Sequence, residues 1–433
     1  MPSRREDGST LPLEIIQLCI RAVLPPLTFS TVRGRSAALI PLSLVNKTWG
    51  SLAQNELYRD VGLQNPEQVG RFLESTKDSQ RLGHKTHSLH LGDPSNEVHG
   101  FQRVMSMLQV LVRTRKVRVI WITGLRPISL FGLAMAPELT ELHAYGIRFM
   151  EPTPLPAHPY PDSFMPAVLL RNLQSITLHS SVIGLVDVNS ETVQVSPHPL
   201  SSVLALLFPP LVSISIFEAH SVDPDLSFSA IDLSSCAADS CETLTIDNRH
   251  PPPEGVESFV KDFSLEWATI LPRYSALQRL ALAEAQDLVP LVEALHPDVT
   301  LIALRVIALR MPCDEGSHSD LQVLALLKKP PPALRRLQRL VLPVAQPTPC
   351  RCSAETTTDG MQVDDEDQEG QAVVRSDESA TGLRQQGYAP ETTRNLIRDL
   401  CAERGINLVE NEWEVDVDAR QHSEDWETAE CRW

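Results

Sequence analysis

The feature that most constrains the fold is a short apolar pattern that recurs along most of the chain. Each copy has the form large-x-x-large-x-large, where "large" stands for a bulky aliphatic residue. The clearest copies are LTELHAY from Leu139, LQSITLH from Leu173, LVSISIF from Leu211, LQRLALA from Leu277, LRVIALR from Leu304 and LQRLVLP from Leu337. Weaker copies surround Leu89, Ile120 and Leu244. Because side chains alternate between two faces along a strand, each copy predicts a β-strand with one apolar face.

Helix-compatible segments separate most of these strands, for example FQRVMSMLQVLVRTRK from Phe101. A strand–helix unit buries only half of its apolar surface, so we expect units to stack, with parallel strands inside and helices outside. The spacing between strand centres is irregular, at roughly 21 to 38 residues against the usual 20 to 29 of leucine-rich repeats. The fold class expected is therefore an irregular α/β repeat solenoid. An ordinary layered α/β domain is the alternative.

Residues 11–63 have helical periodicity instead. Apolar side chains recur at three- and four-residue steps at Leu11, Ile15, Ile16, Leu18, Cys19 and Val23. This spacing predicts an amphipathic helix, for which Thr10 is the expected N-cap and Pro12 fits the first turn. Two further helices are expected at 37–45 and 48–58, after the connection PPLTFSTVRGRS. The interpretation is a small module of three helices.

At these residues the sequence resembles the F-box. The family pattern opens with Leu-Pro, a Glu and two large aliphatic residues, which match Leu11, Pro12, Glu14, Ile15 and Ile16. Its second part matches Leu42, Leu44, Val45, Asn46, Lys47, Trp49, Leu52, Ala53, Leu57, Tyr58 and Arg59. The family usually has a short Asp-Leu link between the halves, whereas this chain has the longer, proline-bearing connection of fungal F-box-like leucine-repeat proteins. The repeats that follow resemble the degenerate leucine-rich solenoids found behind F-boxes.

The resemblance implies a substrate-recognition subunit of a Skp-cullin-F-box ubiquitin ligase. It implies that the module docks on a Skp-type adaptor, and through it on a cullin, while the solenoid binds an unknown protein target. The adaptor-binding residues expected from the motif are Leu11, Pro12, Ile15, Ile16, Leu42, Val45 and Trp49. A module this small cannot bury all of its apolar side chains internally, so an exposed apolar strip needs a partner. A bare three-helix bundle with the same periodicity is the structural alternative.

The target-binding face is weakly specified by the sequence. In the strand at 277–282, alternation predicts that the leucines Leu277, Leu280 and Leu282 point inward. The residues expected outside that inward set are Gln278, Arg279 and Ala281. Arg279, Arg310 and Arg339, which are solvent-side positions by this argument, are candidates for target contact.

Composition changes divide the chain into six expected segments. These are a disordered N-terminus (1–10), the F-box-like module (11–63), the solenoid (64–349), an acidic disordered insertion (350–387), a terminal repeat (388–412) and an acidic tail (413–433). The terminal repeat is expected to have a helix with Leu396, Ile397, Leu400 and Cys401 on one face, a stop at Gly405 and a strand at 406–409. The proline-rich segment from Glu151 to Pro166 is expected to form a surface loop.

The charge distribution argues against nucleic-acid binding. The net charge is −17, and the segments 355–378 and 410–433 hold nine acids each against one and two bases. The remainder is close to neutral and offers no broad positive field for a phosphate backbone. A membrane partner is not expected either, because Pro209 and Pro210 interrupt the longest uncharged stretch. No secretory signal is recognised, and eight scattered cysteines suit reduced thiols in the cytosol or nucleus.

No enzyme motif is recognised in the sequence, so we expect neither catalytic activity nor a cofactor. The pairs Cys236 and Cys241, and Cys350 and Cys352, lack the second pair that a zinc site needs. Cys401 lies on an apolar helix face, which indicates burial rather than a ubiquitin-transfer role. Two alternative functions stay open: a repeat scaffold without a ligase role, favoured by the long connection between the first two helices, and an enzyme with an unrecognised site in a deep pocket.

Overall fold

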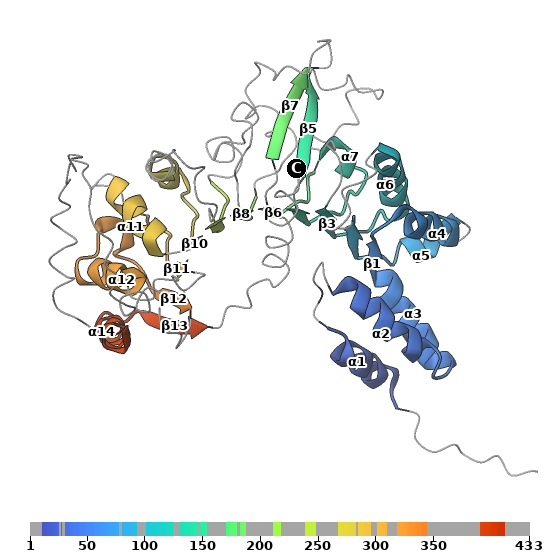
Figure 1. Cartoon of the computed structure of the whole chain (residues 1–433), viewed down its shortest axis with the longest axis horizontal. Coiled ribbons are helices and arrows are strands. Elements are labelled where there is room, and N and C mark those ends of the chain that lie inside the picture. The colour runs from blue at the N-terminus through green and yellow to red at the C-terminus, as the bar shows by residue number, and fades with distance from the viewer. Residues whose placement is uncertain are drawn as a thin grey trace, which may run out of the picture. The chain divides into compact units, whose positions relative to one another are not determined.

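The computed structural model of the chain describes residues 11–25, 27, 31–77, 80–92, 101–123, 130–145, 147–153, 170–179, 182–187, 211–217, 239–247, 267–282, 285–295, 301–309, 318–343 and 390–411. The chain divides into two compact units. The first comprises residues 1–257, 273–277 and 414–433, and the second comprises residues 258–272 and 278–413. Figure 1 labels the helices and strands of each unit. The expected N-terminal tail (1–10), acidic insertion (350–387) and acidic tail (413–433) lie outside the described residues.

The first unit begins with three helices, α1 (Leu13–Val23), α2 (Val32–Ser43) and α3 (Lys47–Arg59). They enclose a small core of fully or nearly buried side chains, namely Ile16, Ile20, Leu24, Leu39 and Ala53. Asn46 caps α3, because its side-chain oxygen accepts hydrogen bonds from the backbone N–H groups of Thr48 (2.9 Å) and Trp49 (3.0 Å). Gly50 lets α3 pass close to α2, since a Cβ at this position would lie 2.7 Å from the Ser43 carbonyl oxygen.

The ends of these helices differ from the sequence expectation. α2 begins at Val32 rather than at 37, so the last five residues of PPLTFSTVRGRS are helical. The Arg35 N–H donates to the Thr31 carbonyl over 2.8 Å, which closes the first turn. α1 begins after Pro12, whose carbonyl accepts from the N–H groups of Ile15 and Ile16, while Thr10 lies outside the described residues.

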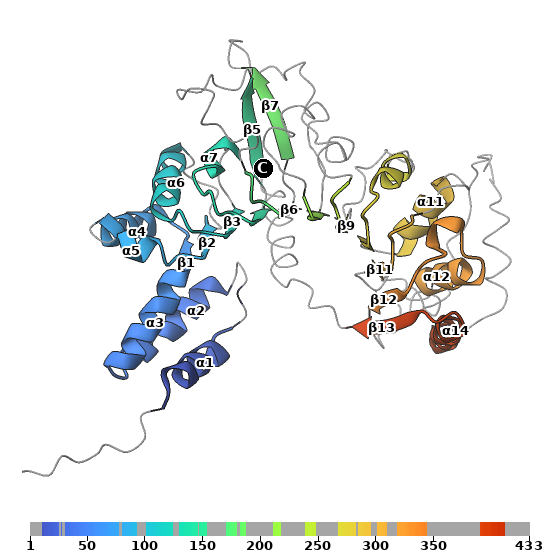
Figure 2. The same cartoon turned by 180° about the vertical axis from the view of Figure 1, so that it is seen from behind.

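Seven parallel strands of the first unit follow one another in chain order. They are β1 (Asp60–Leu63), β2 (Ser88–Leu91), β3 (Val119–Thr123), β4 (Glu141–Tyr145), β6 (Ser175–His179), β8 (Ser213–Phe217) and β9 (Thr243–Asp247). Helices α4 (Pro66–Lys77), α5 (Gln80–Gly83), α6 (Phe101–Arg113) and α7 (Leu130–Leu133) lie on one side of β1–β4 in both views (Figures 1 and 2). Neighbouring strands in sequence are neighbours in space, as in a leucine-rich-repeat-like array and unlike a sheet whose strand order reverses.

A row of apolar side chains fixes the register of this sheet. Leu89, Ile120, Leu142, Ile176, Ile214 and Leu244 pair across β2 to β9, and each is 0% exposed. These are the second large positions of successive copies of the repeat pattern, so the strand prediction is confirmed for each of them. A shift of one residue would turn the whole row to the opposite face, which is why the alternation specifies the pairing.

Three strands were not anticipated. β1 lies at the end of the range expected for the helical module, and it pairs in parallel with β2 instead. β5 (Arg148–Thr153) and β7 (Val182–Asp187) form a separate two-stranded parallel sheet. The prediction of a loop from Glu151 is therefore wrong for 151–153, because Pro152 is accommodated in a short sheet of two edge strands. The rest of that segment, from 154 to 166, lies outside the described residues.

Gly92 ends β2 in a conformation that favours glycine, with a φ of +95°. Its N–H donates to the Leu63 carbonyl over 3.0 Å and so continues the pairing of β1 with β2. A Cβ at this position would lie 1.9 Å from the carbonyl oxygen of Thr123 at the end of β3. The close approach of the two strand ends depends on the missing side chain.

The second unit repeats the architecture with β10 (Arg279–Leu282), β11 (Val306–Leu309), β12 (Arg339–Pro343) and β13 (Asn407–Asn411), which pair in parallel and in chain order. Its described helices include α11 (Ala285–Ala294), α12 (His318–Lys328) and α14 (Pro390–Glu403). Two 3-10 turns are η3 (Leu271–Arg273), at the junction of the two units in sequence, and η4 (Pro332–Leu334). The alternation expected for β10 is confirmed, because Leu280 and Leu282 are buried on one face and Ala281 lies on the other. Ala281 is buried there as well, since it pairs with Ala308, which pairs with Val341, in a small second apolar cluster.

The last strand is reached through α14 and a glycine turn. Gly405 has a φ of +68°, its N–H donates to the Ala402 carbonyl, and the Ile406 N–H donates to the Cys401 carbonyl. This pair of hydrogen bonds is the Schellman motif that ends helices at a glycine. β13 then pairs with β12, although residues 344–389 separate β12 from α14 in the sequence.

Candidate protein-binding surfaces

Helix α1 is apolar on two sides, and only one of them is covered. Ile16 and Ile20 point into the core and are 6% and 0% exposed. Leu11, Ile15 and Leu18, spaced four and three residues apart, form a second stripe that is 56%, 42% and 60% exposed. Residues three and four apart share a helix face, so these side chains form one continuous apolar strip beside α1.

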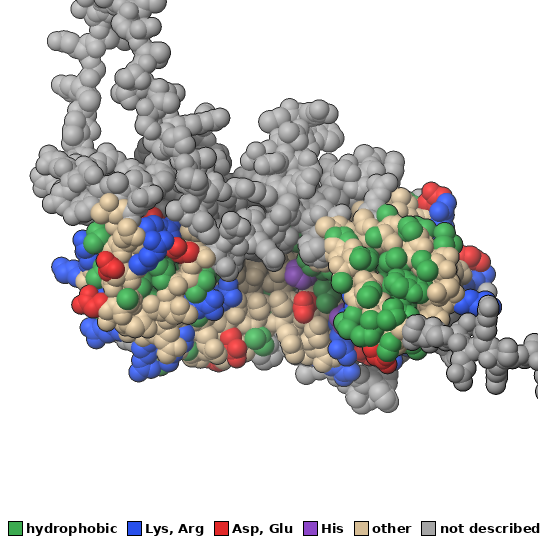
Figure 3. Space-filling view, turned by 90° about the horizontal axis from the view of Figure 1, so that it is seen from below, with side chains coloured by type: hydrophobic (Ala, Val, Ile, Leu, Met, Phe, Trp, Pro, Cys, Tyr) green, Lys and Arg blue, Asp and Glu red, His purple; other side chains and the backbone are tan. Residues whose placement is uncertain are grey.

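Other exposed hydrophobic side chains extend this strip over the module. We define the apolar module surface as Leu11, Leu13, Ile15, Leu18, Val23, Ile40, Leu44 and Val45, all of which are at least 42% exposed. Leu44, at the end of α2, is 80% exposed. Hydrophobic side chains gather on the face of this module that is seen from below in Figure 3. Large exposed apolar patches of this kind mark interaction sites in soluble proteins.

The residues expected at the adaptor face separate into two groups in the structure. Leu11, Pro12, Ile15 and Val45 are exposed and belong to or adjoin the apolar module surface. In contrast, Ile16 is a core residue, and the partly buried side chains of Leu42 and Trp49 pack against the core. Leu13, Leu18, Ile40 and Leu44 were not expected at this face, although the sequence could have identified Leu18 from its spacing to Leu11.

Ion pairs hold the module together beneath this surface. Glu56 on α3 is 4% exposed and accepts hydrogen bonds from Arg21 (2.9 Å) and Gln17 (3.2 Å) of α1. Asp60 of β1 accepts from Arg35 of α2 over 3.0 Å, which joins the module to the first strand. Burial raises the pKa of Asp60, and the neighbouring guanidinium of Arg35 opposes that shift. These contacts keep α1 and α2 in fixed positions and so define the shape of the apolar module surface.

The second candidate surface is a row of stacked rings on the sheet face opposite the leucine row. Trp121 of β3 stacks between His90 of β2 and His143 of β4, with ring centroids 5.3 and 4.1 Å away. Two residues after His143, on the same face of β4, Tyr145 stacks on His179 of β6, with ring centroids 4.4 Å apart. The Trp121 and Tyr145 rings are also close to parallel, with centroids 6.1 Å apart. We call these five residues the ring ladder.

Polar contacts orient parts of the ring ladder. The His90 Nε2 atom lies 3.0 Å from the Ser88 hydroxyl oxygen, within hydrogen-bonding distance. His143 Nε2 lies 3.8 Å from Glu141 Oε2, and this neighbouring imidazole lowers the pKa of the Glu141 carboxyl, with burial opposing the shift. Sequence reasoning missed this surface, yet a signal was present. Aligning the repeat copies on their second large residue places His90, Trp121 and His143 in the same column.

The arginines suggested as target contacts lie outside the ring ladder. Arg279 and Arg339 occupy the first positions of β10 and β12, in one row with Val306 between them. Arg279 is partly buried and Arg339 is exposed, whereas Arg310 lies outside the described residues.

No metal centre is found within the part of the chain that the structure describes, and two of the three described cysteines are buried. No group of three His, Cys, Asp or Glu side chains there could hold a metal ion. Burial raises the pKa of the Cys241 thiol to about 12 and also raises the pKa of Cys401. Cys19 on α1 is exposed. No helix among the described residues is long and apolar enough to cross a membrane.

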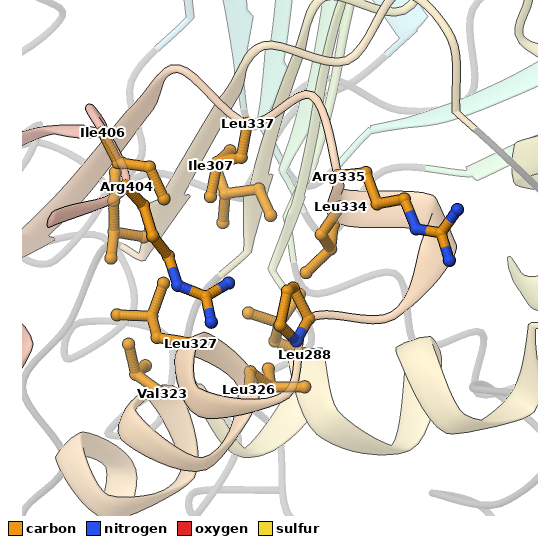
Figure 4. Close-up of a pocket in the computed structure, with 12 residues that line it drawn as sticks. Leu288, Ile307, Val323, Leu326, Leu327, Leu334, Arg335, Leu337, Arg404 and Ile406 are labelled. Atoms are coloured by element: carbon orange, nitrogen blue, oxygen red, sulfur yellow. The ribbon is translucent and has the colours of Figure 1, made fainter. Parts of the chain in front are cut away.

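A pocket of about 270 Å³ opens in the second unit between its helices and strands. Leucine, isoleucine, valine and proline side chains from α11, β11, α12, β12 and the residues before β13 form most of its wall. Arg335 and Arg404 are its charged lining residues. Figure 4 shows the Arg404 guanidinium extending over the apolar wall and that of Arg335 directed away from it.

Comparison with known proteins adds a remote structural likeness. No family model matches the chain, and no curated protein matches it. Among solved structures, the chain is similar to an internalin from Listeria monocytogenes, with 12% sequence identity and a TM-score of 0.27 over 72% of this chain and 70% of that chain. A TM-score this low carries no argument, so the repeat-like fold class stands on the observed strand order and pairing.

Proposed function

We propose that the chain is a substrate-recognition subunit of a Skp-cullin-F-box ubiquitin ligase. In this proposal the three-helix module docks on a Skp-type adaptor, and the repeats bind a target protein. The observation that carries the proposal is the apolar module surface, which shares Leu11, Ile15, Leu44 and Val45 with the F-box-like motif. In this proposal the chain positions the target and takes no part in the transfer reaction itself. Holding the target near a transfer enzyme raises the local concentration of the reacting groups.

The apolar module surface suits a partner protein that presents its own apolar face, built either from helices alone or from helices and strands. Fully burying a leucine, isoleucine or valine side chain contributes about 1.5–3 kcal/mol. Side chains such as Leu44 and Leu18 have most of that contribution left unrealised in the isolated chain. A partner that covers them recovers it, offset by the entropy lost on association.

For the target, we propose Trp121 and His143, the partly exposed members of the ring ladder, as contact residues; the buried His90, Tyr145 and His179 rings support them. Trp and Tyr are enriched among the residues that dominate binding energy, because they bury a large area with few rotatable bonds. Trp121 and His143 are partly exposed, and they lie on strands whose positions are fixed by the buried leucine row. A rigid, partly polar surface of this kind favours a folded or extended polypeptide as its ligand.

Adaptor binding is the direct test. The purified chain is titrated with a Skp-type adaptor in a calorimeter, beside the double variant Ile15→Asp, Val45→Asp. Both residues are exposed, so the variant should keep its circular-dichroism melting curve while its affinity falls at least tenfold, because a carboxylate would be buried in the interface. The matched control is Val112→Asp on α6, which replaces a similarly exposed side chain (43%) outside the module. Failure of the folded wild-type chain to bind would refute the proposal.

A leucine-rich-repeat interaction scaffold without a ligase role is the second candidate. The long connection between α1 and α2, in place of the short link of the family, favours it. The same titration separates the two candidates, since a scaffold would retain target binding and show no affinity for the adaptor.

A further inference from the structure

The cations around the pocket of the second unit have no carboxylate partners among the described residues. Arg335 and Arg404 line the pocket, and three more cations adjoin lining residues in the sequence, namely Lys328, Lys329 and Arg336; all five are exposed. None of the five makes an ion pair with a described carboxylate. Arg404 donates a hydrogen bond to the Lys328 carbonyl over 3.2 Å, and this contact holds the two chain segments together at the pocket.

The sequence concentrates this positive charge. Residues 321–354 contain no acid and six bases, in a chain whose net charge is −17. The acids Asp320 and Glu410 of the same unit are already engaged by Arg394 and Arg398. The pocket therefore lies beside a local positive field in an otherwise acidic protein, and such a field attracts anionic groups.

The pocket size indicates what could enter it. A volume of about 270 Å³ is at the lower limit for drug-sized ligands, whose pockets measure roughly 300–1,000 Å³. One large aliphatic or aromatic side chain suits that space and its apolar wall. A single carboxylate could pair with only one or two of five cations that come from three separate elements. A ligand that uses the whole site therefore needs several negative charges on both sides of one apolar group.

We propose that this pocket and its cations bind an acidic protein segment that carries one large apolar side chain, which names a class of target for the receptor role proposed above. The apolar side chain enters the pocket and contacts its wall at Leu288, Val323, Leu326 and Leu327. The flanking carboxylates pair with Lys329, Arg335 and Arg404. Burial of the apolar group supplies affinity, and the charges supply rate and orientation.

The test uses the full chain and a fluorescein-labelled peptide that has one leucine flanked on both sides by glutamates. Fluorescence anisotropy should show binding that weakens as salt is added, because the cations are exposed. Replacing the leucine with serine should weaken binding about 10- to 100-fold, the factor that corresponds to burying a leucine side chain. Equal binding of the two peptides would overturn the proposal.

Variants of the chain locate the site. Lys329→Glu with Arg335→Glu should weaken peptide binding at least tenfold, whereas Arg115→Glu with Lys116→Glu, the same charge change at exposed positions of the first unit, should not. Leu326→Trp fills the pocket and should abolish the preference for leucine over serine while leaving the salt dependence. Equal effects of the two charge reversals, or an unchanged leucine preference in Leu326→Trp, would contradict the site.

Two further measurements separate the possible occupants. Neutralising the nine acids of 355–378 tests whether this segment of the chain competes with the peptide for the pocket. Tighter peptide binding by that variant would support the pocket as a site for acidic segments. A second measurement uses dodecanoate. The proposal would be overturned in favour of a small amphiphile if dodecanoate binding depends on Leu326 while neither the wild-type chain nor the variant with neutralised acids binds the peptide in a leucine-dependent way. Adaptor binding is measured on the same preparation, so a failed peptide site and a failed ligase role give different results.

Discussion

The buried ion pair between Arg394 and Asp320 makes a sharp prediction about how the last repeat is held. Arg394 Nε on α14 donates to Asp320 Oδ2 on α12 over 2.7 Å, and the two side chains are 8% and 10% exposed. Removing one partner of such a pair typically costs about 3–5 kcal/mol, because the other charge stays buried and unpaired. Glu410 lies 3.8 Å from Arg394 Nη1 and retains part of the attraction. We therefore expect Asp320→Ala to destabilise the docking of α14 by about 3 kcal/mol.

Hydrogen exchange followed by mass spectrometry measures that docking directly. Opening of α14 exposes its amides, and a loss of about 3 kcal/mol corresponds to roughly 100-fold faster exchange in 390–403. The double variant Asp320→Leu, Arg394→Met should restore most of the protection, since two apolar side chains leave no buried charge. Arg398→Ala is the control. Arg398 pairs with Glu410 from a half-exposed position, so this substitution should change amide exchange in α14 little. If Asp320→Ala leaves exchange in α14 unchanged, the reasoning is refuted.

Three further predictions concern single positions. Asn46→Ala should lower the unfolding free energy of the module by about 1 kcal/mol in urea denaturation, because α3 loses its N-cap. Gly34→Ala should stabilise α2 by about 0.5–1 kcal/mol, since no atom lies within 4 Å of a Cβ there, whereas Gly92→Ala should lower the melting temperature strongly. In the native chain at pH 8, N-ethylmaleimide should modify the exposed Cys19 but not Cys241, whose pKa of about 12 keeps the thiol protonated; peptide mass mapping reports both.

Sequence reasoning identified the strands well because their signal is local. The second large residue of each copy lies on the buried face, from Leu89 to Leu244, and alternation alone predicts that placement. The same reasoning missed β5, because Pro152 and the surrounding prolines argued for a loop, and it made no prediction for β7. It also did not anticipate that Ala281 is buried on the opposite face, since that burial depends on Ala308 of β11 and Val341 of β12.

The candidate surfaces were less accessible to sequence reasoning. The F-box-like motif drew attention to the stretch of chain that carries the apolar module surface, but Ile15 and Ile16 are adjacent and equally apolar, and only the packing of α1 on α2 and α3 exposes one and buries the other. The pocket of the second unit was not anticipated at all. Its wall combines Leu288, Leu327 and Ile406, which are far apart in the chain.

The sequence by itself determined the repeating strands, the three-helix start and the uneven charge, because each is expressed within a short window of residues. Tertiary structure alone decided which apolar side chains stay uncovered on the module, how His90, Trp121 and His143 stack across three strands, and where two exposed arginines line an apolar pocket. The physical reason is that burial and pairing are relations between residues brought together by folding. A pattern along one strand or helix specifies its own faces, but not what covers them.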